Sequence, residues 1–284
     1  MILVVIIRSP GVAAPSCSGP RSRGTTFQAH SLPPRETLIA QNLTNPYQRS
    51  NMLPRMSNAE ISDVRALALE EGWLSETPSD FQSAILERCV WQRILPGVAL
   101  THGGDSHGGL VGLIRGRVDF MSAIGPSDTP VAHIARAPFW FGELPVAGRL
   151  RTTTVISRTV CDIALVPQLA LEAVLAAKPD WWRLLGTLSA RGIFLVTLIA
   201  TDLLIRDSQR RCVAVLLRIA GCRKAGTTRC EAEIGQDELA DMANMSRQTV
   251  GVVLRTLEAQ GAVKLGYRSI TITDPVRLRA MVDV

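Results

Sequence analysis

Polar side chains suited to base recognition lie at the start of one amphipathic stretch, residues 245–263, with the sequence MSRQTVGVVLRTLEAQGAV. Arginine can donate two hydrogen bonds to guanine, and glutamine can pair with adenine. Arg247 and Gln248 therefore suit the first turn of a helix that enters the major groove of DNA. Thr249 and Arg255 are expected to contact phosphates and to set the register. The alternative is a solvated helix face on a scaffold that binds protein.

The helix that would carry these side chains is predicted from its cap and its apolar spacing. Ser246 suits the N-cap, because its hydroxyl can accept from a backbone N–H two or three residues later. Gly251 lacks a side chain in mid-helix, which indicates a close approach to another surface. At 100° per residue, the inward side should hold Val250, Val253, Leu254 and Leu257, and the outward side Gln248, Val252 and Arg255.

The flanking segments complete a DNA-binding motif. Residues 235–244, GQDELADMAN, predict a preceding helix, and a short turn then makes a helix-turn-helix. Residues 261–274 alternate apolar and polar side chains beyond a turn at Gly266, which predicts a two-stranded wing. Taken with the cap and the basic first turn, these features favour DNA over a protein partner.

The middle of the chain, residues 96–165, has a different pattern. Short apolar runs such as GLVGLI, RVDFM and TTTVIS are separated by glycines, which is typical of strands and turns. The runs recur about every eight to twelve residues, which favours an antiparallel barrel, roll or sandwich.

Residues 167–221 are expected to be helical, with Pro179 separating a short helix from a long one. Within the long helix, Asp202 interrupts the apolar run, so only about ten uninterrupted residues remain where a membrane span needs about twenty. A buried helix is expected instead. A parallel helix from a second copy could cover one face, and packing against the chain's own domain is the alternative. The near-heptad stripe consists of Leu185, Leu188, Leu195, Ile199 and Leu203.

Composition indicates an ordinary globular protein. The 284 residues, 46% hydrophobic and 20% charged, suit two modest domains and exclude a fibrous or wholly disordered chain. The net charge of +6 mildly favours polyanionic partners. The six cysteines occur singly, which indicates reduced, structural thiols; an iron–sulfur site would have to use the loose pair Cys222 and Cys230.

The first 58 residues are predicted to be a disordered arm, because they are rich in Pro, Ser, Gly and Arg without sustained periodicity. A start site placed too early, with translation beginning at Met52 or Met56, would also explain this composition. No secretory signal is predicted.

Over residues 72–275 the chain resembles the Crp/Fnr family of bacterial transcription regulators. The most specific pieces are residues 245–263, similar to the family's recognition helix, and FGELPVAGRLRTTTV, residues 141–155, similar to its phosphate-binding cassette. The resemblance implies an α+β fold with an antiparallel β-roll of the cyclic-nucleotide-binding jelly-roll type. The implied division is an arm (1–58), a β-roll (59–178), a dimerisation helix (179–207) and a winged helix-turn-helix (208–284).

The resemblance also implies site residues. A cyclic nucleotide, such as cyclic AMP, would be held at its ribose by Gly142 and Glu143 and at its phosphate by Arg151 and Thr152. Thr197 would contact the base, and Leu144 would also line the effector site. In the family's pattern, Pro145 removes a backbone donor and Arg149 adds a second cation. A ligand-free roll with Glu143 paired to Arg151 is therefore the alternative. The implied DNA contacts are Ser246, Arg247, Gln248, Thr249, Gly251, Val252, Arg255 and Arg268, with Val252 offering a methyl contact to thymine.

The implied partners are double-stranded DNA with a two-fold symmetric operator, a second copy of the chain and RNA polymerase, all in the cytoplasm and away from the membrane. No enzyme activity is implied. A cupin-like metal enzyme is a competing interpretation, because His102, His107 and His133 lie in or near the glycine-rich roll.

Overall fold

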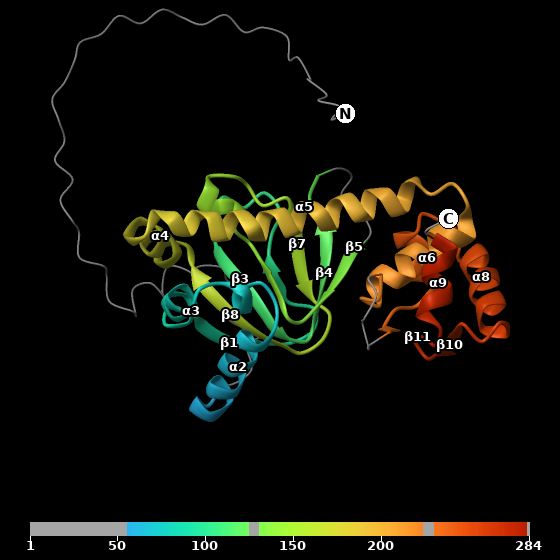
Figure 1. Ribbon diagram of the computed structural model, residues 1–284, viewed down its shortest axis with the longest axis horizontal. Helices are drawn as coiled ribbons and strands as arrows, with labels where there is room; N and C mark the ends of the chain where they lie inside the picture. The colour runs from blue at the N-terminus through green and yellow to red at the C-terminus, as the bar shows by residue number, and fades with distance from the viewer. Residues whose placement is uncertain (1–55, 125–130, 224–229, 283–284) are drawn as a thin grey trace, which may run out of the picture.

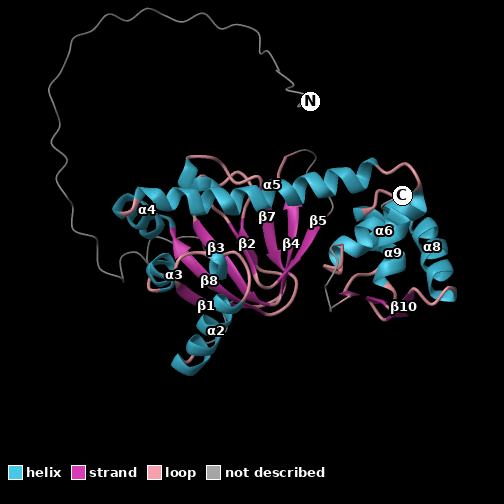
Figure 2. Ribbon diagram, viewed as in Figure 1, coloured by secondary structure: helices cyan, strands magenta, loops and turns pink. Residues whose placement is uncertain are grey.

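The computed structural model describes residues 56–124, 131–223 and 230–282 (Figure 1). An antiparallel roll is followed by one long helix and then by a small helical unit with a three-stranded sheet (Figure 2). This order confirms the α+β fold class. The helices of the first part are α2 (Asn58–Glu70), α3 (Ser79–Leu86), α4 (Gln168–Ala177) and α5 (Trp182–Leu204), with short 3-10 turns at Leu74–Glu76, Leu144–Ala147 and Pro179–Trp181.

The roll consists of two four-stranded antiparallel sheets, with strand orders β1-β8-β3-β6 and β2-β7-β4-β5. The apolar runs identified in the sequence form β3, β4 and β7, and side chains such as Leu113, Val118 and Val155 fill the space between the sheets. The strands are β1 (Val90–Ile94), β2 (Ala99–Thr101), β3 (Gly109–Arg115), β4 (Arg117–Ser122), β5 (Val131–Arg136), β6 (Phe139–Phe141), β7 (Thr153–Ser157) and β8 (Cys161–Pro167).

A helix that the sequence analysis missed, α2, begins inside the predicted disordered arm. Ser57 is its N-cap and shares a capping box with Glu60, and Met56 is buried. Described structure is thus already present at Met56, two residues before the end of the predicted arm at residue 58. Residues 1–55, which include Met52 and Cys17, lie outside the described residues.

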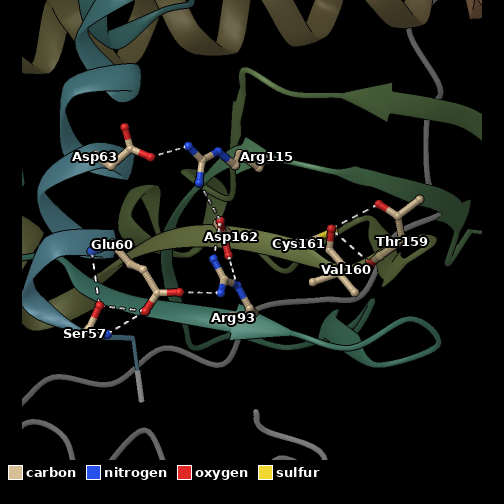
Figure 3. A network of polar contacts seen from close by, with 9 residues as sticks. All are labelled: Ser57, Glu60, Asp63, Arg93, Arg115, Thr159, Val160, Cys161 and Asp162. Atoms are coloured by element: carbon tan, nitrogen blue, oxygen red, sulfur yellow. Dashed lines mark hydrogen bonds and ion pairs between the residues drawn. The ribbon is translucent and has the colours of Figure 1, made fainter. Parts of the chain in front are cut away.

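Ion pairs hold α2 against the roll (Figure 3). Arg93 on β1 donates to Asp162 on β8 at 2.6 Å and to Glu60 on α2 at 2.7 Å. Arg115 on β3 likewise joins Asp162 to Asp63 of α2. Asp162 is almost fully buried, so its two arginine partners compensate a carboxylate that would otherwise be costly to desolvate.

The long helix α5 is mostly exposed, which corrects the expectation of a buried helix. Leu185 and Leu188 pack on the roll, but Ile193 and Val196 are 67% and 65% exposed. Only 11% of the most apolar 18-residue stretch of this helix is buried within the chain. By length and composition alone, Pro179–Leu204 could cross a membrane. Such a helix also arises where helices associate in water, because an interface stripe has the same composition.

The C-terminal unit packs three helices of the motif and a fourth around one core. Leu216, Leu239 and Leu254 lie at its centre and are fully buried. The wing carries a third, short strand that the sequence analysis did not predict, because β9 is only two residues long. The elements are α6 (Ser208–Ile219), β9 (Glu231–Ala232), α7 (Gln236–Met242), α8 (Arg247–Ala259), β10 (Val263–Gly266), β11 (Ser269–Ile272) and α9 (Pro275–Val282).

Candidate nucleic-acid interface and effector cassette

The second helix of the motif, α8, starts where its cap predicts. Ser246 has extended backbone angles, and its Oγ accepts from the Thr249 backbone N–H at 3.1 Å. The same Oγ lies 2.8 Å from the Thr249 hydroxyl, so this hydroxyl already has a partner. The preceding turn is possible because Asn244 adopts a left-handed conformation, with φ 50°, which asparagine tolerates better than most residues.

The two faces of α8 are as predicted. Val250, Val253, Leu254 and Leu257 are buried, whereas Gln248, Val252 and Arg255 are exposed. Arg247 is also exposed, and the helix α8 lies on the side of the unit that points away from the roll (Figure 1). The polar side chains of the first turn therefore have free access to a large partner.

Gly251 is expected from the sequence to approach another surface closely, and the surface that it approaches lies within the chain. It is buried, and a Cβ at this position would lie 3.4 Å from Gln236 Oε1 and 3.4 Å from Arg255 Nη1. Its close approach is to the chain's own α7, so Gly251 is not part of the exposed face.

At the tip of the wing, Tyr267 and Arg268 make the turn between β10 and β11. Arg268 has φ 50°, and its guanidinium reaches Glu238 on α7 at 3.6 Å. Tyr267 is 95% exposed and was missed by the sequence analysis, which placed the turn at Gly266. A large amphipathic side chain at an exposed hairpin tip is available for contact with a partner.

In the cassette, residues 141–155, the structure brings Arg151 and Gly142 together. Arg151 is buried, and a Cβ on Gly142 would lie 2.9 Å from its Nη1. The guanidinium donates to the backbone carbonyls of His107 at 3.3 Å and Gly109 at 3.0 Å. Burial lowers the pKa of Arg151, whereas the nearby carboxylates of Asp105 and Glu143 oppose this shift.

Glu143 points toward α5 rather than to Arg151. Its Oε1 accepts from the Ser189 hydroxyl at 3.0 Å, which links the cassette directly to the long helix. The salt bridge expected for a ligand-free roll, Glu143 with Arg151, does not occur among the described contacts.

The other predicted cassette residues are more dispersed. Leu144 opens a 3-10 turn whose next residue is Pro145, and Thr152 is exposed beside Arg151. Thr197 is exposed on α5, where its carbonyl accepts from Thr201.

The histidines that suggested a metal enzyme are not gathered. His102 and His107 lie in the turn before β3, whereas His133 is buried on β5 beside Arg218. Within the described residues, no three His, Cys, Asp or Glu side chains form a group that could hold a metal ion. The three histidines of the cupin interpretation therefore do not form one site. Four cysteines of this part are buried: Cys89, Cys161, Cys212 and Cys222.

Known proteins match this chain in sequence and in fold. Residues 210–281 match the family model described as a Crp-like helix-turn-helix domain. A CRP-like cAMP-activated global transcriptional regulator of Mycobacterium tuberculosis is 27% identical over 57% of this chain and 70% of that protein. The cAMP-activated global transcriptional regulator CRP of Haemophilus influenzae is 25% identical over 76% and 98%. The c-di-GMP responsive global regulator CLP of Xanthomonas campestris has a similar structure, with a TM-score of 0.54, 20% identity and coverage of 69% and 99%.

A winged helix-turn-helix with an exposed, basic first turn, joined to a β-roll, defines a DNA-binding transcriptional regulator. Its helix-turn-helix domain matches the Crp-like type, and the chain as a whole is similar to Crp/Fnr-type regulators in sequence and in fold.

Proposed function

We propose that the chain acts as a cytoplasmic homodimer on a two-fold symmetric operator, with α5 of each copy forming the dimer contact. The exposed apolar face of α5 carries this proposal. Ile193 and Val196 would each lose contact with water in a dimer, and burial of one such side chain contributes roughly 1.5–3 kcal/mol. Two α8 helices would then meet successive turns of one face of the duplex.

We further propose that the cassette takes a small anion, most simply a cyclic nucleotide. Arg151 and the Thr152 hydroxyl would hold the phosphate, while Glu143 would accept from sugar hydroxyls, since guanidinium and hydroxyl groups solvate a phosphate and a carboxylate accepts. Gly142 supports this arrangement because it leaves room for close packing: a Cβ there would lie 2.7 Å from the Gly109 carbonyl oxygen and 2.9 Å from Arg151 Nη1. The names of the relatives, which include cAMP-activated and c-di-GMP responsive regulators, support the ligand class.

A ligand-free roll is the second candidate. It is favoured by one observation: the Arg151 guanidinium already donates to the carbonyls of His107 and Gly109. An anion would have to compete with these bonds.

These proposals divide the chain into three functional parts. Residues up to 178 would form the effector part, beginning at Met56 rather than at residue 59, residues 179–207 the dimer helix, and residues 208–284 the DNA-binding part. We assign RNA polymerase as a further protein partner and assign no chemical reaction to the chain.

The test uses the full chain. DNA selected from a random pool should yield inverted repeats, and sedimentation should give a dimer on each duplex. Gel shifts with and without cyclic AMP, cyclic GMP and cyclic di-GMP should show tighter binding with one of them. If the selected DNA contains single half-sites bound by monomers, the dimer proposal is contradicted. If DNA affinity is the same with and without each nucleotide, the ligand-free roll is the better description.

A further inference from the structure

A polar bridge joins the roll to the first helix of the DNA-binding motif. Arg158, between β7 and β8, donates from Nε to Asp119 of β4 at 2.6 Å and from Nη2 to Glu238 of α7 at 2.8 Å. The Arg158 side chain is only 14% exposed. Because a guanidinium is a planar fork, two such bonds fix direction as well as distance.

Glu238 is placed to pass this constraint on to the motif. Its other oxygen accepts from the Gly235 backbone N–H at 3.1 Å, which caps α7, and lies 3.6 Å from Arg268 of the wing. Burial opposes ionisation of Glu238, but the hydrogen bonds from Arg158 and Gly235 outweigh it and lower its pKa. One carboxylate thus contacts the roll, α7 and the wing.

Other contacts also join the two parts, including Arg218 of α6, which donates to Asp202 of α5 at 2.9 Å and to the Ala132 carbonyl of β5 at 3.4 Å. Ile134 of β5 packs into the core of the C-terminal unit, and Arg117 of β4 pairs with Glu233. Apolar packing is non-directional, and the Glu233 side chain is half exposed, so neither of these two contacts fixes an angle. Arg218 holds α6, whereas the Arg158 fork holds α7, the helix that precedes α8.

We propose that Arg158 is a positioning residue for DNA binding: by tying Glu238 to Asp119, it sets the orientation in which α8 is presented to the second half of a two-fold site. The proposal rests on the dimeric function above. Since α7 and α8 are joined by the tight turn at residues 243–246, fixing α7 also fixes α8. Two recognition helices must be about one DNA turn, roughly 34 Å, apart to bind both half-sites.

The experiment compares two duplexes, one with a single half-site and one with two, in fluorescence-anisotropy titrations of the full chain. For Arg158→Gln, we expect the preference for two half-sites over one to fall about tenfold, with single-site affinity unchanged. Arg115→Gln is the matched control, because Arg115 also bridges two carboxylates, Asp63 of α2 and Asp162 of β8, and neither belongs to the C-terminal unit. It should retain the wild-type preference.

An unchanged preference in Arg158→Gln, or an equal loss on both duplexes, would overturn the proposal, since general loss of charge or stability affects both alike. If Arg158→Gln fails to fold, Asp119→Asn is the second variant. It retains the contact between Arg158 and Glu238 but weakens the contact between Arg158 and β4, so it should also lower the preference for two half-sites. If the wild-type protein shows no preference for two half-sites, the proposed dimeric function is contradicted. This failure is distinguishable from failure of the Arg158 proposal because it is seen before any substitution is made.

Discussion

Arg247 Nε of α8 lies 3.1 Å from Asp237 Oδ1 of α7, and the two side chains are 71% and 67% exposed. A carboxylate thus occupies part of the hydrogen-bonding capacity that we assign to a guanine. Because the pair is solvated, it contributes little to stability, about 0–1 kcal/mol. Its main effect is expected on the bound state, where an acidic side chain would approach DNA phosphates.

Replacing the carboxylate should therefore strengthen binding. In Asp237→Asn, repulsion from the phosphates and competition for Arg247 are both removed, so we expect affinity to rise up to about fivefold at low salt, less at high salt. Filter binding over a salt series measures this. Asp63→Asn, which removes an equally exposed carboxylate from α2, should leave DNA affinity unchanged; weaker binding by Asp237→Asn would contradict the interpretation.

Loss of the arginine should weaken binding and relax specificity. A bidentate arginine–guanine contact discriminates by about 1–3 kcal/mol, so Arg247→Ala is expected to lose roughly 10- to 150-fold on the selected operator and far less on random DNA. Competition gel shifts distinguish the two. Arg65→Ala, on the exposed side of α2, is the control for net charge. Equal losses on both DNAs would reduce Arg247 to a phosphate contact.

The cassette makes a separate prediction. If Arg151 holds the phosphate, Arg151→Gln should weaken binding of cyclic AMP about tenfold or more, because hydrogen bonds to charged groups contribute about 1.5–3 kcal/mol. Titration calorimetry measures this directly. Arg149→Gln removes the exposed cation two residues away and should have little effect. The reverse result would assign the anion to Arg149.

The dimer contact can be tested without DNA. A double variant, Ile193→Asp and Val196→Asp, places two charges on the apolar face of α5 and should raise the dimer dissociation constant by at least about 100-fold. Analytical ultracentrifugation over a concentration series measures it. Val276→Asp alters a similarly exposed side chain on α9 and should remain dimeric. A dimeric double variant would place the contact elsewhere.

Stability should fall in mild acid because of His133. Burial, with a smaller effect of Arg218, lowers its pKa to about 3. Between about pH 6.5 and pH 3 the unfolded chain binds a proton that the folded chain does not, so the free energy of unfolding decreases as pH falls through this window. His133→Gln should flatten the decrease by up to about 1.4 kcal/mol per pH unit. Urea unfolding of the wild type and of His133→Gln between pH 7 and pH 4 measures how the free energy of unfolding depends on pH. If the two dependences run parallel, His133 is not the cause of the decrease.

Local patterns in the sequence were enough to predict the DNA-binding helix. Ser246, the apolar spacing of α8 and the turn before it act over a few residues, so propensity and periodicity describe them well. The roll strands followed from the same kind of signal. The helix α2 was missed, although Ser57 and Glu60 have the spacing of a capping box, because its apolar pattern is weak.

Contacts between distant segments could not be predicted. Arg158 and Glu238 are 80 residues apart, and Glu143 and Ser189 are 46 apart; both pairs exist only because the chain folds back on itself. The carbonyl partners of Arg151 belong to a turn whose sequence carries no ligand signal. The exposure of α5 could not be predicted for the same reason, because it depends on which of its faces the distant roll covers.

The contact between Glu143 and Ser189 gives α5 the geometry of a lever arm. From Ser189 to its end at Leu204 the helix extends about 22 Å, at 1.5 Å per residue. A tilt of about 10° at the cassette would displace the far end by about 4 Å, roughly one base-pair step along the duplex. An atomic-scale rearrangement around a small anion would thus be magnified into a misalignment that a duplex can detect.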